Sequence, residues 1–423
     1  MPLTICIYED SKYRNFTPLT HFRPVYTLRA GVVPLFERAK RHFGDAALCL
    51  SCRGQLATVL ASCYKAYAVN IIKKNATDIL LLNGRIRDYG DLPKLIREAK
   101  ISTHFTSGGE TVALLWKNDS IRNLPEVATP SDYHRYFKEH GDEIPEFHTT
   151  ATLYEYLWHI MADIEREITT DFEKVKSSLG APMNVRIHDG VYWVNQDNVI
   201  LGNDVEIMPG SVIDASRGPV FIDNNSRVES HAAIYGPTYI GPNCVIVAGK
   251  ISGCSIGHTC RVGGEIEASV FQSYVNKYHA GFIGHSYVGS WVNFGAMTTN
   301  SDLKNNYSNI RVTVNGESVD TGSNKVGSFI GDHTKFGIGM LLTTGINVGV
   351  CCNLFGGSLI SDKEIPSFKW GATGSYTEYD YRKALETARI TAARRNYTLS
   401  DAEEGLMIAL AEDKCNGAGT LDI

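Results

Sequence analysis

The sequence predicts a two-part fold, an α/β N-terminal domain followed by a left-handed parallel β-helix built from hexapeptide repeats. Three observations predict it. Strand-like and helical segments alternate over roughly the first 150 residues, a long amphipathic segment follows, and an aliphatic residue then recurs every six positions from about Val199 to Ile360. Alternating strands and helices indicate a parallel or mixed sheet. A six-residue period indicates short strands stacked in successive coils.

In the N-terminal part, we expect strands at residues 3–8, 46–50, 78–83 and 109–116, and a helix within residues 31–43 that ends at Gly44. Residues 152–178 are expected to form a helical arm, because apolar residues recur there at three- and four-residue intervals. The tail from Tyr376 to about Glu412 is expected to be helical, with a basic middle. The predicted domains are 1–150 (α/β domain), 151–180 (connecting arm), 181–365 (β-helix) and 366–423 (helical tail).

The repeats can be written in sixes, for example at residues 201–206, 240–245 and 336–341. The aliphatic side chain that opens each six points into a narrow core, and each coil stacks on the next through backbone hydrogen bonds. A glycine-rich β-sandwich would instead alternate every two residues. An excursion from Asn300 to about Lys325 fits no hexad, and a loop of that length is usually functional.

The composition narrows the class of protein. A net charge of −5 over 423 residues argues against a protein that coats nucleic acid. No apolar run is long enough to predict a membrane span, and the early charges near the N-terminus are unlike a signal peptide, so we expect a cytoplasmic protein. Cys49 and Cys52 have redox or zinc spacing, but we interpret the ten cysteines as free thiols in a reducing compartment.

The segment from Asn276 to Ala296 is the candidate site for chemistry in the β-helix. Such β-helices commonly associate around a threefold axis and bind ligands between coils, and many are acyl-CoA-dependent acyltransferases. Acyl transfer to an amine needs a base, for which histidine is suited, and donors for the carbonyl oxygen. By spacing alone, His279 is equally a base or a solvated residue, His258 and His285 are surface residues, and His333 is structural.

At this segment the chain resembles the bifunctional N-acetylglucosamine-1-phosphate uridyltransferase / glucosamine-1-phosphate N-acetyltransferase family. His279 stands five residues before Gly284 and fourteen before the Asn-Phe-Gly-Ala motif that begins at Asn293, and a polar loop with Lys304 follows. The resemblance is closer to a variant bacterial branch whose N-terminal sugar nucleotidyltransferase domain is atypical. It is carried by residues 18–24, 28–31, 263–268, 276–277, 284–286, 291–296, 300–305, 331–335 and 367–371.

The resemblance implies roles for individual residues. It makes His279 the general base and places Asn293 and Lys304 on the sugar phosphate, while Phe282 replaces a tyrosine that contacts the sugar. Asn276, Lys277 and Arg261 are further candidates for substrate binding. Candidates for binding acetyl-CoA are Ala296, Gly337 and Gly356 in the groove between coils, with Arg389, Arg394 and Arg395 for the CoA phosphates.

The N-terminal domain departs from the usual sugar nucleotidyltransferase pattern. It keeps Pro18-Leu-Thr and Arg23-Pro24, but residues 9–15 replace the glycine-rich phosphate turn and Val25 replaces a lysine. The metal-binding aspartate after the third strand is missing, so the ligands of a magnesium ion stay unassigned. The candidate nucleotide-binding residues are Lys12, Arg14, Thr20, Arg23, Arg29, Asn83 and Arg85.

These observations favour a homotrimeric transferase that acetylates an amino-sugar 1-phosphate with acetyl-CoA. If the N-terminal site is active, it transfers a nucleotide from UTP or another nucleoside triphosphate, with Mg²⁺, to a sugar 1-phosphate for envelope polysaccharide. Two alternatives stay open. One is a nucleotidyltransferase whose β-helix only trimerises, and the other is a non-catalytic scaffold that binds a sugar nucleotide.

Overall fold

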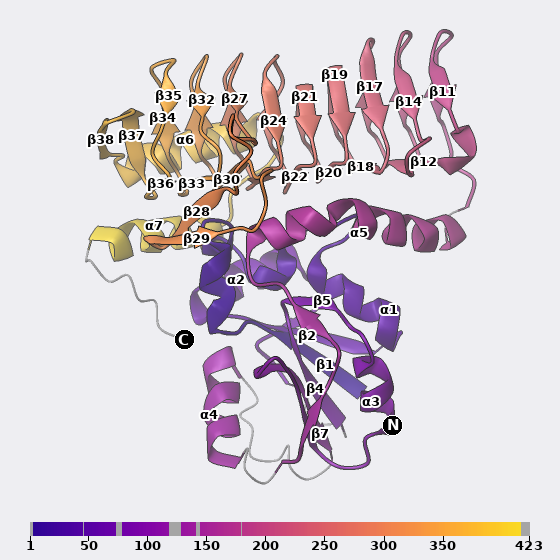
Figure 1. Cartoon of the computed structure of the whole chain (residues 1–423), viewed down its shortest axis with the longest axis vertical. Helices are drawn as coiled ribbons and strands as arrows, with labels where there is room; N and C mark the ends of the chain where they lie inside the picture. The colour runs from indigo at the N-terminus through magenta and orange to yellow at the C-terminus, as the bar shows by residue number, and fades with distance from the viewer. Residues whose placement is uncertain are drawn as a thin grey trace.

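The computed structural model describes residues 3–44, 46–72, 78–117, 128–140, 144–178 and 180–415. An elongated β-helix lies against an α/β domain, and helix α5 (Leu157–Ser178) runs between the two, along the β-helix (Figure 1). The predicted fold class, a mixed-sheet α/β domain followed by a left-handed parallel β-helix, is confirmed.

The N-terminal domain is built on one mixed sheet. Strand β1 pairs in parallel with β2 and β4, whereas β7 is antiparallel to both β4 and β6. The sheet order is β3 (Ala68–Val69), β2 (Ala47–Ser51), β1 (Leu3–Tyr8), β4 (Asp78–Asn83), β7 (Glu110–Lys117), β6 (Thr103–Ser107) and β8 (Glu146–His148). The four predicted strands are therefore found within one residue of their expected limits. The helices of this domain are α1 (Lys40–Phe43), α2 (Gly54–Cys63), α3 (Leu92–Glu98) and α4 (Pro130–His140).

The connecting helix begins later than the periodicity predicted. Thr152 and Leu153 form strand β9, which pairs with β5 (Ile86–Asp88), and helix α5 starts only at Leu157. Its apolar stripe is buried together with aromatic side chains that the β-helix presents on its outer surface, among them Phe221, Tyr239 and Tyr287. The arm is thus packed along its length and does not simply connect two domains.

The β-helix has three faces of parallel strands. The first contains β10 (Arg186–Ile187), β13 (Glu206–Ile207), β16 (Arg227–Val228), β19 (Val245–Ser252), β21 (Arg261–Glu267), β23 (Asn276–Lys277), β26 (Asn293–Phe294), β31 (Lys335–Phe336), β34 (Asn353–Leu354) and β37 (Lys369–Ala372). The second contains β11 (Tyr192–Val194), β14 (Val212–Asp214), β17 (Ala232–Tyr235), the later parts of β19 and β21, β24 (Phe282–Gly284), β27 (Thr299–Asn300), β32 (Leu341–Leu342) and β35 (Leu359–Ile360).

The third face lies toward α5. It contains β12 (Val199–Leu201), β15 (Val220–Ile222), β18 (Thr238–Ile240), β20 (Ser255–Ile256), β22 (Val270–Phe271), β25 (Tyr287–Val288), β30 (Ser328–Ile330), β33 (Ile346–Val348) and β36 (Glu364–Ile365). The residues that open the hexads meet in register inside the coil and form one continuous apolar core, as in Val228, Ile246 and Val262. This core explains why the six-residue period predicts the fold, because each coil buries its aliphatic residues only against its neighbours.

The excursion after Asn300 folds into a hairpin, β28 (Arg311–Val314) and β29 (Glu317–Asp320), that docks on the N-terminal domain. Asn315 at its tip donates from Nδ2 to the backbone oxygen of Arg14 over 2.9 Å, and it accepts from Thr17 Oγ1 over 3.1 Å. Part of this loop therefore joins the two domains.

The tail differs from the predicted continuous helix. Tyr376 lies in β38 (Ser375–Glu378), which pairs with β37, and two helices follow, α6 (Tyr381–Ala393) and α7 (Asp401–Cys415). Helix α7 packs near α2 of the N-terminal domain (Figure 1). Among the described residues, no helix is both long and apolar enough to cross a membrane. The cysteines whose side chains are described are all free, and the neighbour of Cys49 is Cys6, at 3.4 Å between sulfur atoms, rather than Cys52.

Candidate functional site

Three of the predicted substrate-binding residues lie side by side on the first face of the β-helix. Arg261, Asn276 and Asn293 occupy the same register in successive coils. Asn276 donates from Nδ2 to Asn293 Oδ1 over 2.9 Å, and Arg395 from the tail reaches the same amide, with 3.4 Å from Nη2 to Asn276 Oδ1. The structure therefore brings together residues from the β-helix and from the C-terminal tail.

Arg261, Asn276 and Asn293 form a ladder on this face, and the arginines in and beside it concentrate positive charge there. Burial and the neighbouring guanidinium groups of Arg261 and Arg394 lower the pKa of Arg395. No acidic side chain among the described residues forms an ion pair with Arg261, Arg394 or Arg395. Arginine side chains that have no carboxylate partner are well suited to bind a phosphate group. Arg389 differs, since it forms a bidentate ion pair with Glu404 at 2.6 Å.

His279 lies at the corner that follows this face, in the turn between β23 and β24. Its side chain is exposed, and its ring centroid is 5.4 Å from that of Tyr278. The same corner in the following coils holds Ala296, Gly337 and Gly356, the residues predicted to bind acetyl-CoA. Adjacent coils are joined there by hydrogen bonds from the amide of Met297 to the oxygen of Ala280 and from Gly339 to Ala296. The corner thus forms a continuous edge beside the ladder of Arg261, Asn276 and Asn293.

Lys277 does not lie on that surface. It occupies the core-facing register between Val262 and Phe294, it is fully buried, and its ammonium group donates to the backbone oxygens of His279 and Ala280, the latter over 3.2 Å. Its expected contact with substrate is therefore not supported. Its position instead makes it an internal support for the turn that carries His279.

Lys277 predicts a pH-dependent stability. Burial lowers its pKa from 10.5 to about 8, so between those pH values the folded chain has lost a proton that the unfolded chain still holds. Stability therefore rises with pH across this window, by up to about 3 kcal/mol. In Lys277→Met this contribution should vanish when urea unfolding is measured from pH 7 to 10.5.

The matched control is Lys335→Met. Lys335 is half-buried, with a pKa lowered to about 8, and its ammonium group binds the backbone oxygen of Trp291, at a different corner. Both variants should lose a similar pH dependence. Wild-type activity of Lys277→Met in acetyl transfer would argue against a role for Lys277 in holding His279.

The remaining predicted residue of this region, Lys304, lies in the loop after β27. Its ammonium group donates to the backbone oxygen of Asn309 over 2.6 Å. A nearby pair was not predicted: His285 Nδ1 lies 2.7 Å from Asp302 Oδ2, and both side chains are largely buried. His285 was expected to be a routine surface residue. Only the folded loop reveals its carboxylate partner, and that geometry makes it a rival base.

In the N-terminal domain, three predicted nucleotide-binding residues gather where β1 and β4 end. Arg85 is fully buried and contacts Asp10 at 2.5 Å and Glu110 at 2.6 Å, while Lys12 binds the other oxygen of Glu110 at 2.7 Å. Asn83 donates to Asp10 over 2.8 Å. Carboxyl ends of parallel strands are the usual ligand site of such sheets. Asp10 and Glu110 were not predicted, although Asp10 lies only two residues after the end of the first strand.

The geometry does not fit a magnesium site as it stands. Asp10 and Glu110 are the carboxylates available to a cation, and the guanidinium group of Arg85 lies between them. The described residues contain no cluster of three or more histidine, cysteine, aspartate or glutamate side chains that could hold a metal ion.

The other four predicted nucleotide-binding residues lie elsewhere. Thr20 is buried and donates to the backbone oxygen of Tyr13. The backbone of Arg14 anchors the hairpin tip, as described above. Arg23 pairs with Asp332 of the β-helix and donates to Ser290 Oγ over 3.3 Å, and Arg29 lies over the ring of Tyr239. Both arginines thus face the β-helix rather than the sheet edge.

The N-terminal α/β domain, joined here to a β-helix, is the part of the chain that matches a known family model. Residues 5–178 match the family described as sugar nucleotidyl transferase. The resemblance seen in the sequence is confirmed by two curated relatives. One is a bifunctional sugar-1-phosphate nucleotidylyltransferase/acetyltransferase of Sulfurisphaera tokodaii, 26% identical over 215 residues, which cover 48% of this chain and 50% of the relative.

The second relative is the bifunctional protein GlmU of Methanococcus vannielii, 31% identical over 134 residues, which cover 31% of this chain and 30% of the relative. The chain thus spans half or less of the length of these curated relatives. Among solved structures, a UDP-N-acetylglucosamine acyltransferase from Campylobacter jejuni is 16% identical, with a TM-score of 0.37, over 56% of this chain and 92% of that one.

Proposed function

We propose that this protein transfers an acetyl group from acetyl-CoA to the amine of an amino-sugar 1-phosphate. The observation that carries the proposal is the ladder of Arg261, Asn276, Asn293 and Arg395 beside the exposed imidazole of His279. The arginines bind the sugar phosphate, the two amides bind hydroxyl groups, and the corner of the next coils receives the thioester.

In this reaction the amine nitrogen attacks the thioester carbon, a C–N bond forms, and the C–S bond breaks. His279 removes the proton from the attacking nitrogen and passes it to the leaving thiolate of CoA. Backbone amides at the corner that holds Ala296, Gly337 and Gly356 stabilise the oxyanion. Lys277 holds the turn of His279 from within, since two backbone oxygens of that turn accept from its ammonium group.

The test is CoA release from acetyl-CoA and glucosamine 1-phosphate. Release that requires both substrates and yields an N-acetylated sugar phosphate supports the proposal, and its absence contradicts it. Pyrophosphate release from UTP and N-acetylglucosamine 1-phosphate tests a second activity, which the family match of residues 5–178 favours. At the sheet edge, the charges of Lys12 and Arg85 are compensated by Asp10 and Glu110, so the support for acetyl transfer is stronger.

We further propose that the protein is a homotrimer whose subunits meet at the corner of His279. Large apolar side chains are exposed there in successive coils: Met297 is 59% exposed and Ile338 is 74% exposed, and Tyr278 and Phe355 lie beside them. Exposed apolar surface of this kind usually marks an interface. Contact with a second copy would cover it and enclose the substrate groove.

Ile338→Asp should therefore dissociate the trimer and lower CoA release, because it places a charge in the apolar contact. Light scattering should then report the mass of one 46.6-kDa chain in place of three. The matched control is Ile101→Asp, because Ile101 is 61% exposed on the N-terminal domain, away from this corner. A wild-type protein that is already monomeric and active would contradict this part of the proposal.

A further inference from the structure

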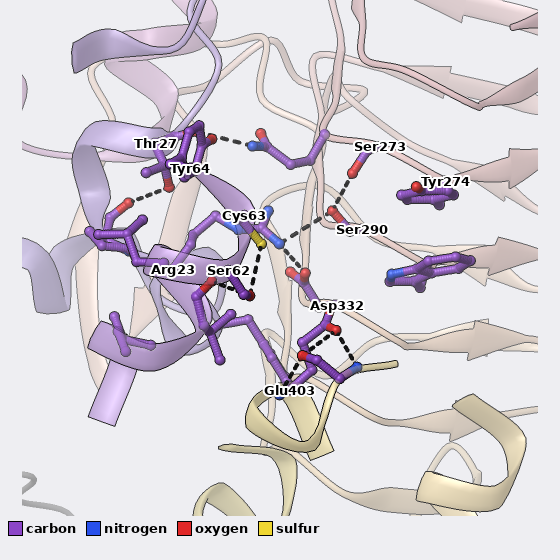
Figure 2. A pocket seen from close by; sticks show the side chains of 18 of the residues that line it. Arg23, Thr27, Ser62, Cys63, Tyr64, Ser273, Tyr274, Ser290, Asp332 and Glu403 are labelled. Carbon is purple, nitrogen blue, oxygen red and sulfur yellow. Dashed lines mark hydrogen bonds and ion pairs between the residues drawn. The ribbon is translucent and has the colours of Figure 1, made fainter. Parts of the chain in front are cut away.

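A cavity of about 760 Å³ lies between the N-terminal domain, the β-helix and the C-terminal tail. Helix α2 and the segment around Arg23 form one wall, a corner of the β-helix forms the opposite wall, and the segment that contains Tyr397 and Glu403 closes one side (Figure 2). The cavity is distinct from the sheet edge with Arg85 and from the corner with His279, neither of which lines it. Its volume is that of a pocket for a small organic ligand.

The β-helix wall has an unusual composition. At this corner each coil has a residue with positive φ, and the first coils place Asp204, Asn225 and Asn243 there, residue types that tolerate this backbone conformation. Beside the cavity, the same position is Tyr274 (φ 55°), Trp291 (φ 64°) and His333 (φ 61°). Bulky side chains are disfavoured in that conformation, and such residues concentrate at functional sites.

These rings form an ordered column. Tyr274 and Trp291 stack with 3.9 Å between centroids and 7° between planes, and Tyr397 from the tail packs against both at 5.5 Å. The edges of aromatic rings carry partial positive charge, and the indole of Trp291 has an N–H donor as well. A planar heterocycle with acceptor atoms matches this wall in shape and in polarity.

Arg23 and Arg29 also line this cavity. Arg23 uses Nη2 for Asp332 and Ser290, and Arg29 uses Nη1 for the backbone oxygen of Val32. Among the described residues, Arg23 Nη1 and Arg29 Nε are buried and have no hydrogen-bond partner, and His333 Nδ1 is in the same situation. Buried guanidinium N–H groups nearly always find acceptors. Phosphate oxygens are the acceptors that arginine recognises best.

We propose that this cavity is a separate binding site for a nucleoside phosphate, with the base among Tyr274, Trp291 and Tyr397 and the phosphates on Arg23 and Arg29. The inference does not depend on the acetyl-transfer reaction. Because the site is lined by both domains and by the tail, the bound nucleotide fastens these three parts together. UTP, ATP and CoA each contain a nucleoside phosphate, and direct binding measurements show which of these three compounds the cavity binds.

The experiment measures binding to the full-length protein by calorimetry, with UTP, ATP, CoA and inorganic tripolyphosphate as separate probes. Two variants remove the site. Ser62→Trp fills the cavity from the exposed end of α2 without changing the β-helix, and Trp291→Leu removes the central ring. We expect at least a tenfold loss of nucleotide affinity in both variants, with circular dichroism unchanged. Lys12→Met at the sheet edge and His279→Ala at the acetyl-transfer corner should leave this affinity intact.

Cys63 locates the bound ligand, because its exposed thiol lies at the cavity. Nucleotide should slow its alkylation by N-ethylmaleimide at least tenfold, as read by mass spectrometry of the peptide. Equal affinity for tripolyphosphate would refute recognition of the base. Nucleotide binding that survives Ser62→Trp and is lost in Lys12→Met would place the ligand at the sheet edge, and no binding of any nucleotide would also overturn the proposal. CoA release is assayed separately, so either proposal can fail alone.

Discussion

His279→Ala is expected to reduce CoA release from acetyl-CoA and glucosamine 1-phosphate by about 10²–10⁴-fold, the usual contribution of a positioned general base. The imidazole is exposed in a turn, and the hydrogen bonds that hold this turn involve its backbone and Lys277 rather than its ring. The fold should therefore persist, with an unchanged circular dichroism spectrum. Substrate binding through Arg261 and Arg395 should also persist, so the loss should appear in kcat rather than in KM.

The matched control is His285→Asn, because His285 lies on the next corner of the same coil and pairs with the carboxylate of Asp302. If His279 is the base, this variant should retain most of its activity. The opposite result, with activity lost in His285→Asn and retained in His279→Ala, would assign proton transfer to the His285–Asp302 pair.

Arg23→Met is expected to destabilise the contact between the domains by about 3–5 kcal/mol, the usual cost of removing one partner of a buried ion pair. Arg23 reaches from the N-terminal domain to Asp332 of the β-helix, and the Asp332 side chain is only 3% exposed. Without Arg23, the carboxylate would stay buried without a compensating charge. The midpoint of urea unfolding should fall by about 1–2 M.

Two further measurements test whether the buried carboxylate of Asp332 causes this loss of stability. Burial already raises the pKa of Asp332, so lowering the pH in Arg23→Met should protonate this carboxyl and reduce the deficit in stability. The double variant Arg23→Met/Asp332→Asn should likewise recover more than half of the loss. A single variant as stable as the wild type, or a double variant no more stable than the single one, would show that this ion pair does not hold the domains together.

Much of the site could be predicted from local spacing. Arg261, Asn276 and Asn293 are in register because the coil repeats, so residues at matching places in successive hexads lie beside one another. The same regularity places His279, Ala296, Gly337 and Gly356 along one corner. Strand β1 was predicted to the residue, since its apolar run is buried between two neighbouring strands.

Lys277 shows where spacing alone was insufficient. A lysine next to a catalytic turn suggests a phosphate ligand, but the parity of its position directs it into the core, where backbone oxygens accept from its ammonium group. The coil register, read to the single residue, contained this signal. The positive charge of a lysine, in contrast, suggests a position on the surface.

The β-helix could be predicted from the sequence, because a repeat encodes contacts between neighbouring coils in the order of the chain. The choice of His279 as candidate base came from the resemblance to a known family, since spacing alone left its role open. Only the tertiary structure decided the contacts between distant parts. It brought Arg395 to Asn276, turned Arg23 and Arg29 from the nucleotide edge toward the β-helix, and placed Tyr397 beside Trp291. Such contacts depend on how whole surfaces pack, and no local period in the sequence reports that packing.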